Sequence, residues 1–253
     1  ATASLTALNA QNTNFAVTTS DATNIAQYDA IDNVNGNGSI TVASIADTAA
    51  NCNPNGAIHG LFTANSGIAV ALSDTTITDV ADINRIKAAT TGDVSATASG
   101  TAAVLQGLTA STTDTLNLTV TGAAASVTHG AAIADATIGT VDFSAGGLDD
   151  TTTNLSSNTY AALDKVVAKD GDVVITLSDA ATTLEASVLQ TIGGKTSGDV
   201  TITNGQTKIQ GTEAELTAAL VTAGSKVILG GSTPFEISSG TAAFDKVQAL
   251  AGV

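Results

Sequence analysis

The chain carries the tripeptide Gly-Asp-Val at three places, as Gly92-Asp93-Val94, Gly171-Asp172-Val173 and Gly198-Asp199-Val200. These copies lie 79 and 27 residues apart, and a repeated unit of about 26 residues accounts for both intervals. Degenerate copies at the same spacing raise the count to about eight units. They begin at Gly38, Gly67, Asp114, Gly139 and Gly224. Repetition on this scale is typical of architectures built by stacking one supersecondary unit.

Apolar and small polar residues alternate after the Gly turns, for example from Leu116 to Val120 and from Val200 to Thr203. This alternation predicts strands with one buried face. Between the strands, apolar residues recur every three or four positions, which predicts short amphipathic helices. The clearest sets are Ile77, Val80, Ile83 and Ile86; Tyr160, Leu163, Val166 and Val167; Leu184, Val188, Leu189 and Ile192; and Leu216, Leu220 and Val221. We expect helix N-caps at Thr212 and at Ser178-Asp179.

Each repeated unit is therefore predicted to be a short helix, a Gly turn and a short strand. One such unit cannot bury its own apolar faces, whereas stacked units with parallel strands can. We expect an α/β repeat that forms a parallel-strand solenoid of about eight coils. A β-solenoid and a doubly wound α/β sheet are the alternatives, because a doubly wound sheet also alternates helix and strand.

Both ends of the chain depart from the repeat, which divides the sequence into three parts. Residues 1–35 are predicted to be an N-terminal cap or assembly segment, with a weak helix around Ile25, Tyr28 and Ile31. Residues 36–230 are the predicted repeat region. Residues 231–253 are predicted to end in a cap helix. Its apolar positions are Phe244, Val247 and Leu250.

The charge balance limits the partners. The net charge is −15, and no Lys or Arg precedes Arg85. Nucleic acid is not an expected partner, since binding it requires cations that neutralise phosphates. Apolar runs such as Ile68–Leu72 are far shorter than the roughly 20 residues that span a bilayer, so the chain is not expected to be membrane-spanning. Cys52 is the single cysteine and cannot form an internal disulfide.

The sequence offers no catalytic constellation. Nucleophilic catalysis needs a base beside the nucleophile and a group that orients the base. His59 and His129 are the only histidines, and each stands among small residues, so we expect surface or interface roles for both. No catalytic residue is assigned, and the protein is not expected to be an enzyme.

Calcium is the cofactor that the composition favours. Loop carboxylates supply the oxygen ligands that calcium takes, and acidic residues cluster at Asp149-Asp150, at Asp170 with Asp172, and at Asp79 with Asp82. Solvated turns use Asp for other reasons, so ordinary turn chemistry is the competing interpretation. The residues chosen as candidate metal ligands are Asp149, Asp150, Asp170 and Asp172.

Two segments carry a family resemblance. In Ile77–Ala96 and Leu184–Thr203 a short helix ends in Thr-Thr-Gly-Asp-Val or Thr-Ser-Gly-Asp-Val, with Leu-Ser-Asp flanking it. This arrangement resembles repeat regions of large secreted, adhesin-like surface proteins of cyanobacteria, and similar repeats are found in phage virion appendages. The resemblance implies a structural or adhesive role and carries over no catalytic residue.

These observations together predict a secreted structural protein, located outside the cell or at its surface. We expect it to self-assemble into an extracellular filament or surface layer, or to form a segment of a fibre, with itself and a cell envelope or virion as partners. The first alternative is a monomeric calcium-dependent adhesin or glycan-binding module. A virion appendage protein is the third possibility.

Overall fold

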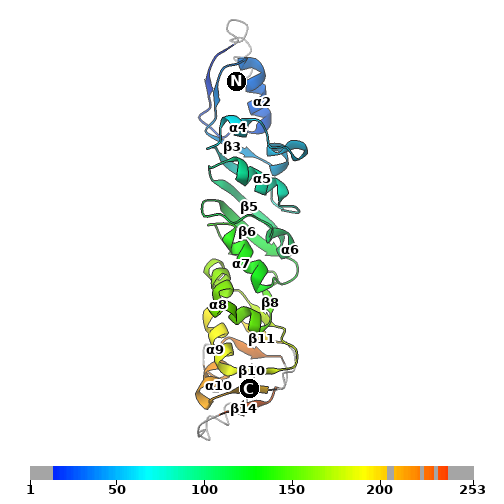
Figure 1. Ribbon diagram of the computed structural model, residues 1–253, viewed down its shortest axis with the longest axis vertical. Coiled ribbons are helices and arrows are strands. Elements are labelled where there is room, and N and C mark those ends of the chain that lie inside the picture. The colour runs from blue at the N-terminus through cyan, green and yellow to red at the C-terminus, as the bar shows by residue number, and fades with distance from the viewer. Residues whose placement is uncertain (1–13, 204–207, 223–224, 231–232, 239–253) are drawn as a thin grey trace. The chain divides into compact units, whose positions relative to one another are not determined.

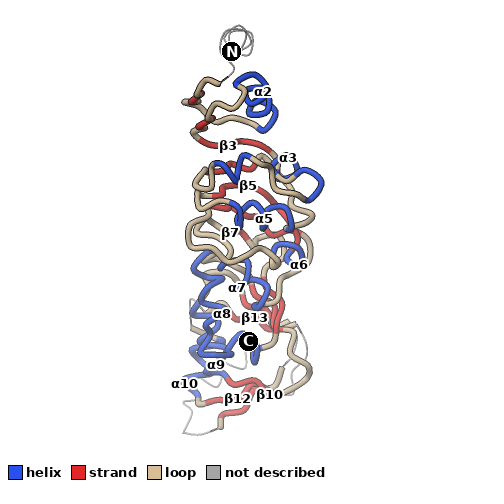
Figure 2. The backbone as a smooth tube through the Cα atoms, turned by 45° about the horizontal axis from the view of Figure 1, so that its top comes forward, coloured by secondary structure: helices blue, strands red, loops and turns tan. Residues whose placement is uncertain are grey.

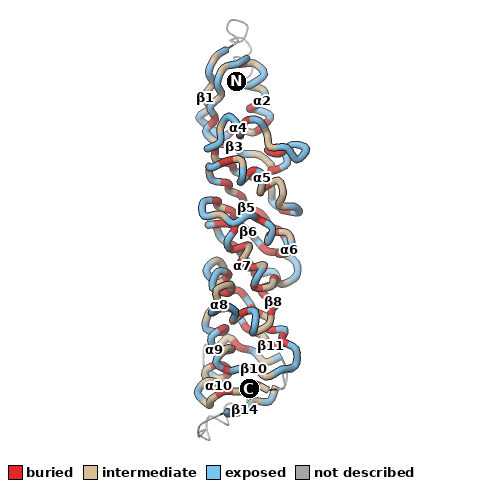
Figure 3. The backbone as a smooth tube through the Cα atoms, viewed as in Figure 1, coloured by how far each residue is buried: buried red, intermediate tan, exposed pale blue. Residues whose placement is uncertain are grey.

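The computed structural model describes residues 14–203, 208–222, 225–230 and 233–238 (Figure 1). Its contacts divide the chain into two compact units. Unit 1 comprises Ala1–Gly100, Gly107–Leu118 and Ala136–Gly139. Unit 2 comprises Thr101–Gln106, Thr119–Asp135 and Thr140–Val253. Buried residues run through the elements of both units (Figure 3).

Unit 1 alternates short strands with short helices. Its elements are β1 (Val17–Thr18), α2 (Ile25–Asn35), β2 (Ile40–Thr41), β3 (Ser44–Asp47), α3 (Ala49–Cys52), the 3₁₀ turn η1 (Pro54–Gly56), α4 (Leu61–Ala64), β4 (Ala69–Leu72), α5 (Ala81–Ala89), β5 (Val94–Thr101) and the start of β6 (Thr115–Thr121). Ile45, Val70 and Val94 lie in register on neighbouring strands and are almost fully buried. This column of side chains forms the centre of the unit's core.

In unit 2, α7, α8, α9 and α10 pack in succession (Figure 1). Its elements are α6 (Ala102–Leu105), α7 (Val127–Asp135), β7 (Val141–Asp142), β8 (Leu148–Asp150), α8 (Thr152–Lys169), β9 (Ile175–Leu177), β10 (Thr183–Glu185), α9 (Ala186–Lys195), β11 (Val200–Ile202), β12 (Lys208–Gly211), α10 (Glu213–Leu220), β13 (Val227–Leu229) and β14 (Phe235–Ile237). Leu148, Ile175, Val200 and Val227 form its central buried column.

The strands form four sheets, and every strand pairing with a described register is parallel. The sheet orders are β1-β2, β3-β4-β5-β6-β7, β13-β11-β9-β8 and β10-β12-β14. Figure 2 shows β10 and β12 side by side. Partners come from one repeat to the next, as in the pairing of Val17 with Ile40 and of Val200 with Val227.

The expected solenoid of about eight coils is wrong. The fold is a mixed α/β fold with several parallel sheets, and among the described strands no single ladder continues through eight units. One physical reason is that β1, β2 and β7 are only two residues long, which leaves too few main-chain hydrogen bonds to carry a ladder onward. The β-solenoid is wrong because helices separate the strands. The doubly wound sheet is wrong because strand order within each sheet follows the chain without reversing.

The helix predictions agree in part with the structure. The weak N-terminal helix is α2, and Thr212 caps α10 in a reciprocal capping box with Glu215. The N-cap predicted at Ser178-Asp179 is wrong, because the Asp179 carboxylate accepts hydrogen bonds from the Thr152 amide at the start of α8. The helix set that begins at Leu184 starts two residues later, since Leu184 lies in β10. The predicted C-terminal cap helix lies outside the described residues.

A buried Thr two residues before a Gly ties successive repeats together. The Thr196 hydroxyl donates to the Val173 carbonyl at 2.7 Å and accepts from the Gly198 amide at 2.9 Å. Thr137 and Thr90 make the same two bonds, donating to the carbonyls of Leu116 and Ile68 and accepting from the amides of Gly139 and Gly92. A Cβ on Gly198 would lie 2.2 Å from the Asp172 carbonyl oxygen, so the backbones approach too closely for any other residue.

Candidate functional site

The structure separates the first pair of candidate calcium ligands. Asp149 and Asp150 are neighbours in β8, and side chains of successive strand residues point to opposite faces. Asp149 is exposed beside Thr176, whereas Asp150 is buried. The Asp150 carboxylate accepts hydrogen bonds from the amides of Val127 and Thr151, at 2.9 Å each. It therefore serves as a cap for α7, and the two carboxylates do not converge on one ion.

In the second pair, Asp170 bonds both to Asp172 and to a main-chain donor. Asp170 accepts a 2.7 Å hydrogen bond from the Phe143 amide, 27 residues earlier in the chain. Burial raises the pKa of Asp170, and a side-chain hydrogen bond and the charge of Asp172 raise it further, followed by the charge of Asp142. The bond from Phe143 acts in the opposite direction. The Asp170 side chain is thus already engaged by the Phe143 amide and by Asp172.

The carboxylates of the remaining acidic cluster, Asp79 and Asp82, also bond to groups of the protein itself. Asp79 accepts from the Ala81 amide at 2.9 Å, and Asp82 bonds Asn53 at 2.5 Å and Arg85 at 3.0 Å. Within the described ranges, no three His, Cys, Asp or Glu side chains group so that they could hold a metal ion.

An Asp-Thr-x-x-Asn pattern occurs once in each unit, and the sequence analysis missed it. In Asp47-Thr48-Ala49-Ala50-Asn51, Asp47 accepts from the Thr48 amide, the Asn51 side-chain amide and the Ile25 amide at the start of α2. Thr48 in turn accepts from the Asn51 amide. The same four bonds recur in Asp150-Thr151-Thr152-Thr153-Asn154, with Val127 in the place of Ile25. These carboxylates hold one repeat against the helix of the preceding one.

His59 lies in a structural arrangement in unit 1. Its Nε2 lies 3.1 Å from Asp29 Oδ1 in α2, and its Nδ1 accepts a hydrogen bond from the Leu61 amide. The ring packs edge-on against Tyr28 with centroids 5.8 Å apart. Burial raises the pKa of the Cys52 thiol to about 12, which removes it as a nucleophile for this histidine. His129 is half-buried in α7 of unit 2.

One of the two cations in the first 164 residues is buried. Lys87 Nζ lies 3.3 Å from Asp114 Oδ2, and the two side chains are 5% and 7% exposed. The ammonium also donates to the carbonyls of Thr109 and Ala136. Burial lowers the pKa of Lys87, and the charge and hydrogen bond of Asp114 oppose that shift. Each of the three N–H groups of the Lys87 ammonium therefore has an acceptor, and the side chain connects loops of unit 1.

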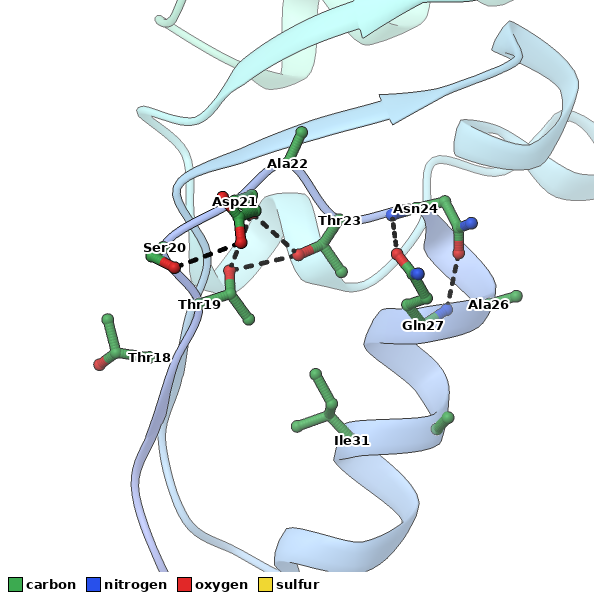
Figure 4. Close-up of a pocket in the computed structure, with 11 residues that line it drawn as sticks. Thr18, Thr19, Ser20, Asp21, Ala22, Thr23, Asn24, Ala26, Gln27 and Ile31 are labelled. Carbon is green, nitrogen blue, oxygen red and sulfur yellow. Dashed lines mark hydrogen bonds between the residues drawn. The ribbon is translucent and has the colours of Figure 1, made fainter. Parts of the chain in front are cut away.

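A hollow in unit 1 lies between the segment Thr18–Asn24 and one face of α2 (Figure 4). Its volume is about 670 Å³. The hydroxyl-rich wall is bonded within itself, since Thr23 donates to Thr19 and Ser20 to Asp21. Ala26, Ala30 and Ile31 supply the opposite, apolar wall, from which Ile31 projects towards the loop (Figure 4). The hollow therefore offers apolar surface more than free hydrogen-bonding groups.

Three strands in the described part of the chain lie at sheet edges near the ends of the sequence. β1 has β2 as its neighbour, β13 has β11, and β14 has β12. Edge strands present main-chain N–H and C=O groups that can pair with another chain. Ile228 in β13 is 45% exposed, which places an apolar side chain on one of these edges.

Comparisons with protein-family models, with curated proteins and with solved structures found no match to this chain. None of the described helices combines the length and the apolar character needed to cross a membrane.

Proposed function

We propose that this chain is a structural protein of the cell surface or extracellular space, which associates with further copies of itself. The assembly is a filament, a surface layer or a segment of a fibre. The observation that carries this proposal is that carboxylates and buried hydroxyls form hydrogen bonds to main-chain groups of neighbouring repeats.

The acidic residues illustrate this use. Asp47, Asp150 and Asp179 each accept from the first amide of a helix in the preceding repeat. Asp74 does the same for Ala49, at 2.7 Å. A carboxylate that accepts two or more such bonds is held in place and has little freedom to contact a substrate. This pattern supports a role in which rigidity of the chain is the useful property.

The free edges supply the route to assembly. Unit 1 and unit 2 each end in edge strands of parallel sheets. An edge strand of one copy can therefore pair with an edge strand of the next copy, with both strands running in the same direction. Contact between two different surfaces of identical copies does not close on itself unless the rotation happens to form a ring. Such an arrangement supports extended assemblies.

The net charge of the chain determines the salt concentration at which copies should associate. A net charge of −15 makes copies repel one another, and dissolved salt screens that repulsion within about 8–10 Å at physiological ionic strength. We expect association to increase with ionic strength. Calcium is proposed as a general counterion here, with no assigned ligand set.

The test combines electron microscopy with sedimentation velocity over a concentration series of the purified protein. Regular filaments or sheets and a growing sedimentation coefficient are expected. Leu229→Pro removes an edge N–H that points away from β11, and should abolish assembly while far-UV circular dichroism stays unchanged. Ile228→Thr keeps the main-chain donors of β13 and serves as the matched control. Single monomers at every concentration would refute the proposal and favour the monomeric binding module.

A further inference from the structure

We propose that β13 of one copy pairs with β1 of the next copy, in parallel, with Val227 opposite Val17 and Ile228 opposite Thr18. This contact rests on the proposed self-association and specifies the surfaces that make it. The second copy also covers the hollow between Thr18–Asn24 and α2.

The hydrogen-bonding groups of β1 are divided between its two sides. The Val17 amide donates to the Ser39 carbonyl at 2.9 Å, and the Thr19 amide donates to the Thr41 carbonyl at 3.0 Å. Along a parallel strand, alternate residues direct both of their main-chain groups to the same neighbour. The N–H and C=O of Thr18 therefore face away from β2, towards the edge of β1 that no described strand covers.

The free edge of β13 has the complementary pattern. The Val200 amide donates to the Lys226 carbonyl, and the Gly230 amide donates to the Ile202 carbonyl. Lys226, Ile228 and Gly230 thus face β11, and the N–H and C=O groups of Val227 and Leu229 face outward.

Placing Thr18 opposite Ile228 satisfies both edges at once. The Thr18 amide then donates to the Val227 carbonyl, and the Leu229 amide donates to the Thr18 carbonyl. Within unit 2, Val200 lies opposite Val227 and its amide already donates to the Lys226 carbonyl in the same way. The proposed contact repeats an arrangement that the chain uses internally.

Side chains at the contact also continue existing columns. Thr176, Thr201 and Ile228 lie in register on the outer face of the unit 2 sheet, and Thr18 would extend that column and cover part of the exposed Ile228. Val17 would extend the buried column that ends at Val227. An exposed apolar side chain gains about 25 cal/mol for each Å² removed from water, so this covering favours the contact.

Charge and the hollow favour the same occupant. Asp21 is the only charged residue among those that line the hollow, and no cation precedes Arg85 in the sequence. Lys226 stands immediately before β13 and would lie opposite Ala16 in this register, so its positive charge would enter a segment of the next copy that has no cation of its own. The apolar wall of Ala26, Ala30 and Ile31 matches a protein surface better than a polar small molecule, because the opposite wall's hydroxyls already bond one another.

Cysteine cross-linking tests the register directly. Thr18→Cys and Ile228→Cys are made in separate proteins, which are mixed and oxidised mildly, so any mixed disulfide joins two copies. Adjacent strands lie about 4.8 Å apart, within the 4.4–6.8 Å range of Cα separations in disulfides. Native Cys52 is buried and does not interfere. Thr201→Cys replaces Ile228→Cys in the matched control, because β13 would separate it from Thr18.

We expect a covalent dimer on non-reducing gels for Thr18→Cys with Ile228→Cys, and several-fold less with Thr201→Cys or with either protein alone. Assembly of the wild type without this selective cross-link overturns the proposed register and leaves self-association intact. A wild type that stays monomeric by sedimentation, with no cross-link, overturns both the register and the proposed function.

Discussion

Thr137→Val tests whether buried hydroxyls hold successive repeats together. Thr137 is 3% exposed, and its hydroxyl accepts from the Leu116 amide at 2.7 Å and from the Gly139 amide at 2.8 Å. It also donates to the Leu116 carbonyl at 2.8 Å. Valine has nearly the same shape without the hydroxyl, so this change removes the bonds while it preserves the packing.

The expected loss follows from the groups left without a partner. Two amides and the carbonyls of Leu116 and Asp114 lose the Thr137 hydroxyl, and each buried polar group left unsatisfied costs about 1–3 kcal/mol. Partial relaxation lowers the total, and we expect the free energy of unfolding to fall by about 2–4 kcal/mol. Thr137→Ser keeps the hydroxyl and loses only a methyl group, which should cost about 1 kcal/mol.

Urea unfolding followed by far-UV circular dichroism measures these differences. Thr97→Val is the matched control, because Thr97 is an exposed residue of β5, where the same substitution should change the free energy of unfolding by less than about 0.5 kcal/mol. A Thr137→Val protein as stable as the Thr97→Val protein would refute the structural role assigned to the buried threonines.

Three further predictions concern charge and glycine. Asp170→Asn should stabilise the protein at neutral pH. The pKa of Asp170 is raised in the folded protein, so the stability that Asp170 contributes is fully present below pH 3.8 and is lost as the pH rises through the folded-state pKa. Equal gains from Asp170→Asn in urea titrations at acidic and neutral pH would contradict this. Gly198→Ala should lower the melting temperature, because the new Cβ would lie 2.2 Å from a carbonyl oxygen. In Gly194→Ala, in α9, the new Cβ has no neighbour within 4 Å, and the free energy of unfolding should rise by up to about 1 kcal/mol. A stability change of the same sign in both variants would contradict the close approach at Gly198. Lys87→Met leaves a buried carboxylate without its cation and should cost about 3–5 kcal/mol, measured by urea unfolding, and a loss below about 1 kcal/mol would show that the pair is dispensable.

Local elements were the most predictable part of the fold. Alternation marked β6 and β11, and a capping pattern marked Thr212 at the start of α10. Periodicity reports which face of a segment is buried, and that property is local. It does not show how many consecutive strands pair in one continuous sheet. The sheets divide where strands such as β7 are only two residues long, and this could not be predicted from periodicity.

The polar ties were visible in the sequence but were not recognised there. Thr-x-Gly recurs at Thr90, Thr137 and Thr196, and the Gly residues were assigned only to turns. Their structural requirement is the close approach of a carbonyl from the preceding repeat, which no local pattern reveals. Strand alternation already indicated that Asp149 and Asp150, as adjacent strand residues, point to opposite faces.

Backbone conformation inside α8 was beyond prediction from sequence. Asn158, Thr159 and Tyr160 have φ angles of 47°, 57° and 65°, in the left-handed region that such residues rarely adopt. The apolar spacing from Tyr160 to Val167 predicted a helix there, and the interruption just before it has no signature in that spacing. Lys195, whose Nζ lies 5.1 Å from the centroid of the Tyr160 ring, contacts this interruption from the neighbouring helix.

Association through β13 can be measured by sedimentation velocity of the wild-type protein and of Leu229→Pro, each from dilute to concentrated solution at physiological ionic strength. We expect the sedimentation coefficient of the wild type to grow with concentration, and that of the variant, with an unchanged circular dichroism spectrum, to stay at the monomer value. A wild type that remains monomeric, or a variant that associates as the wild type does, would contradict association through the edge of β13.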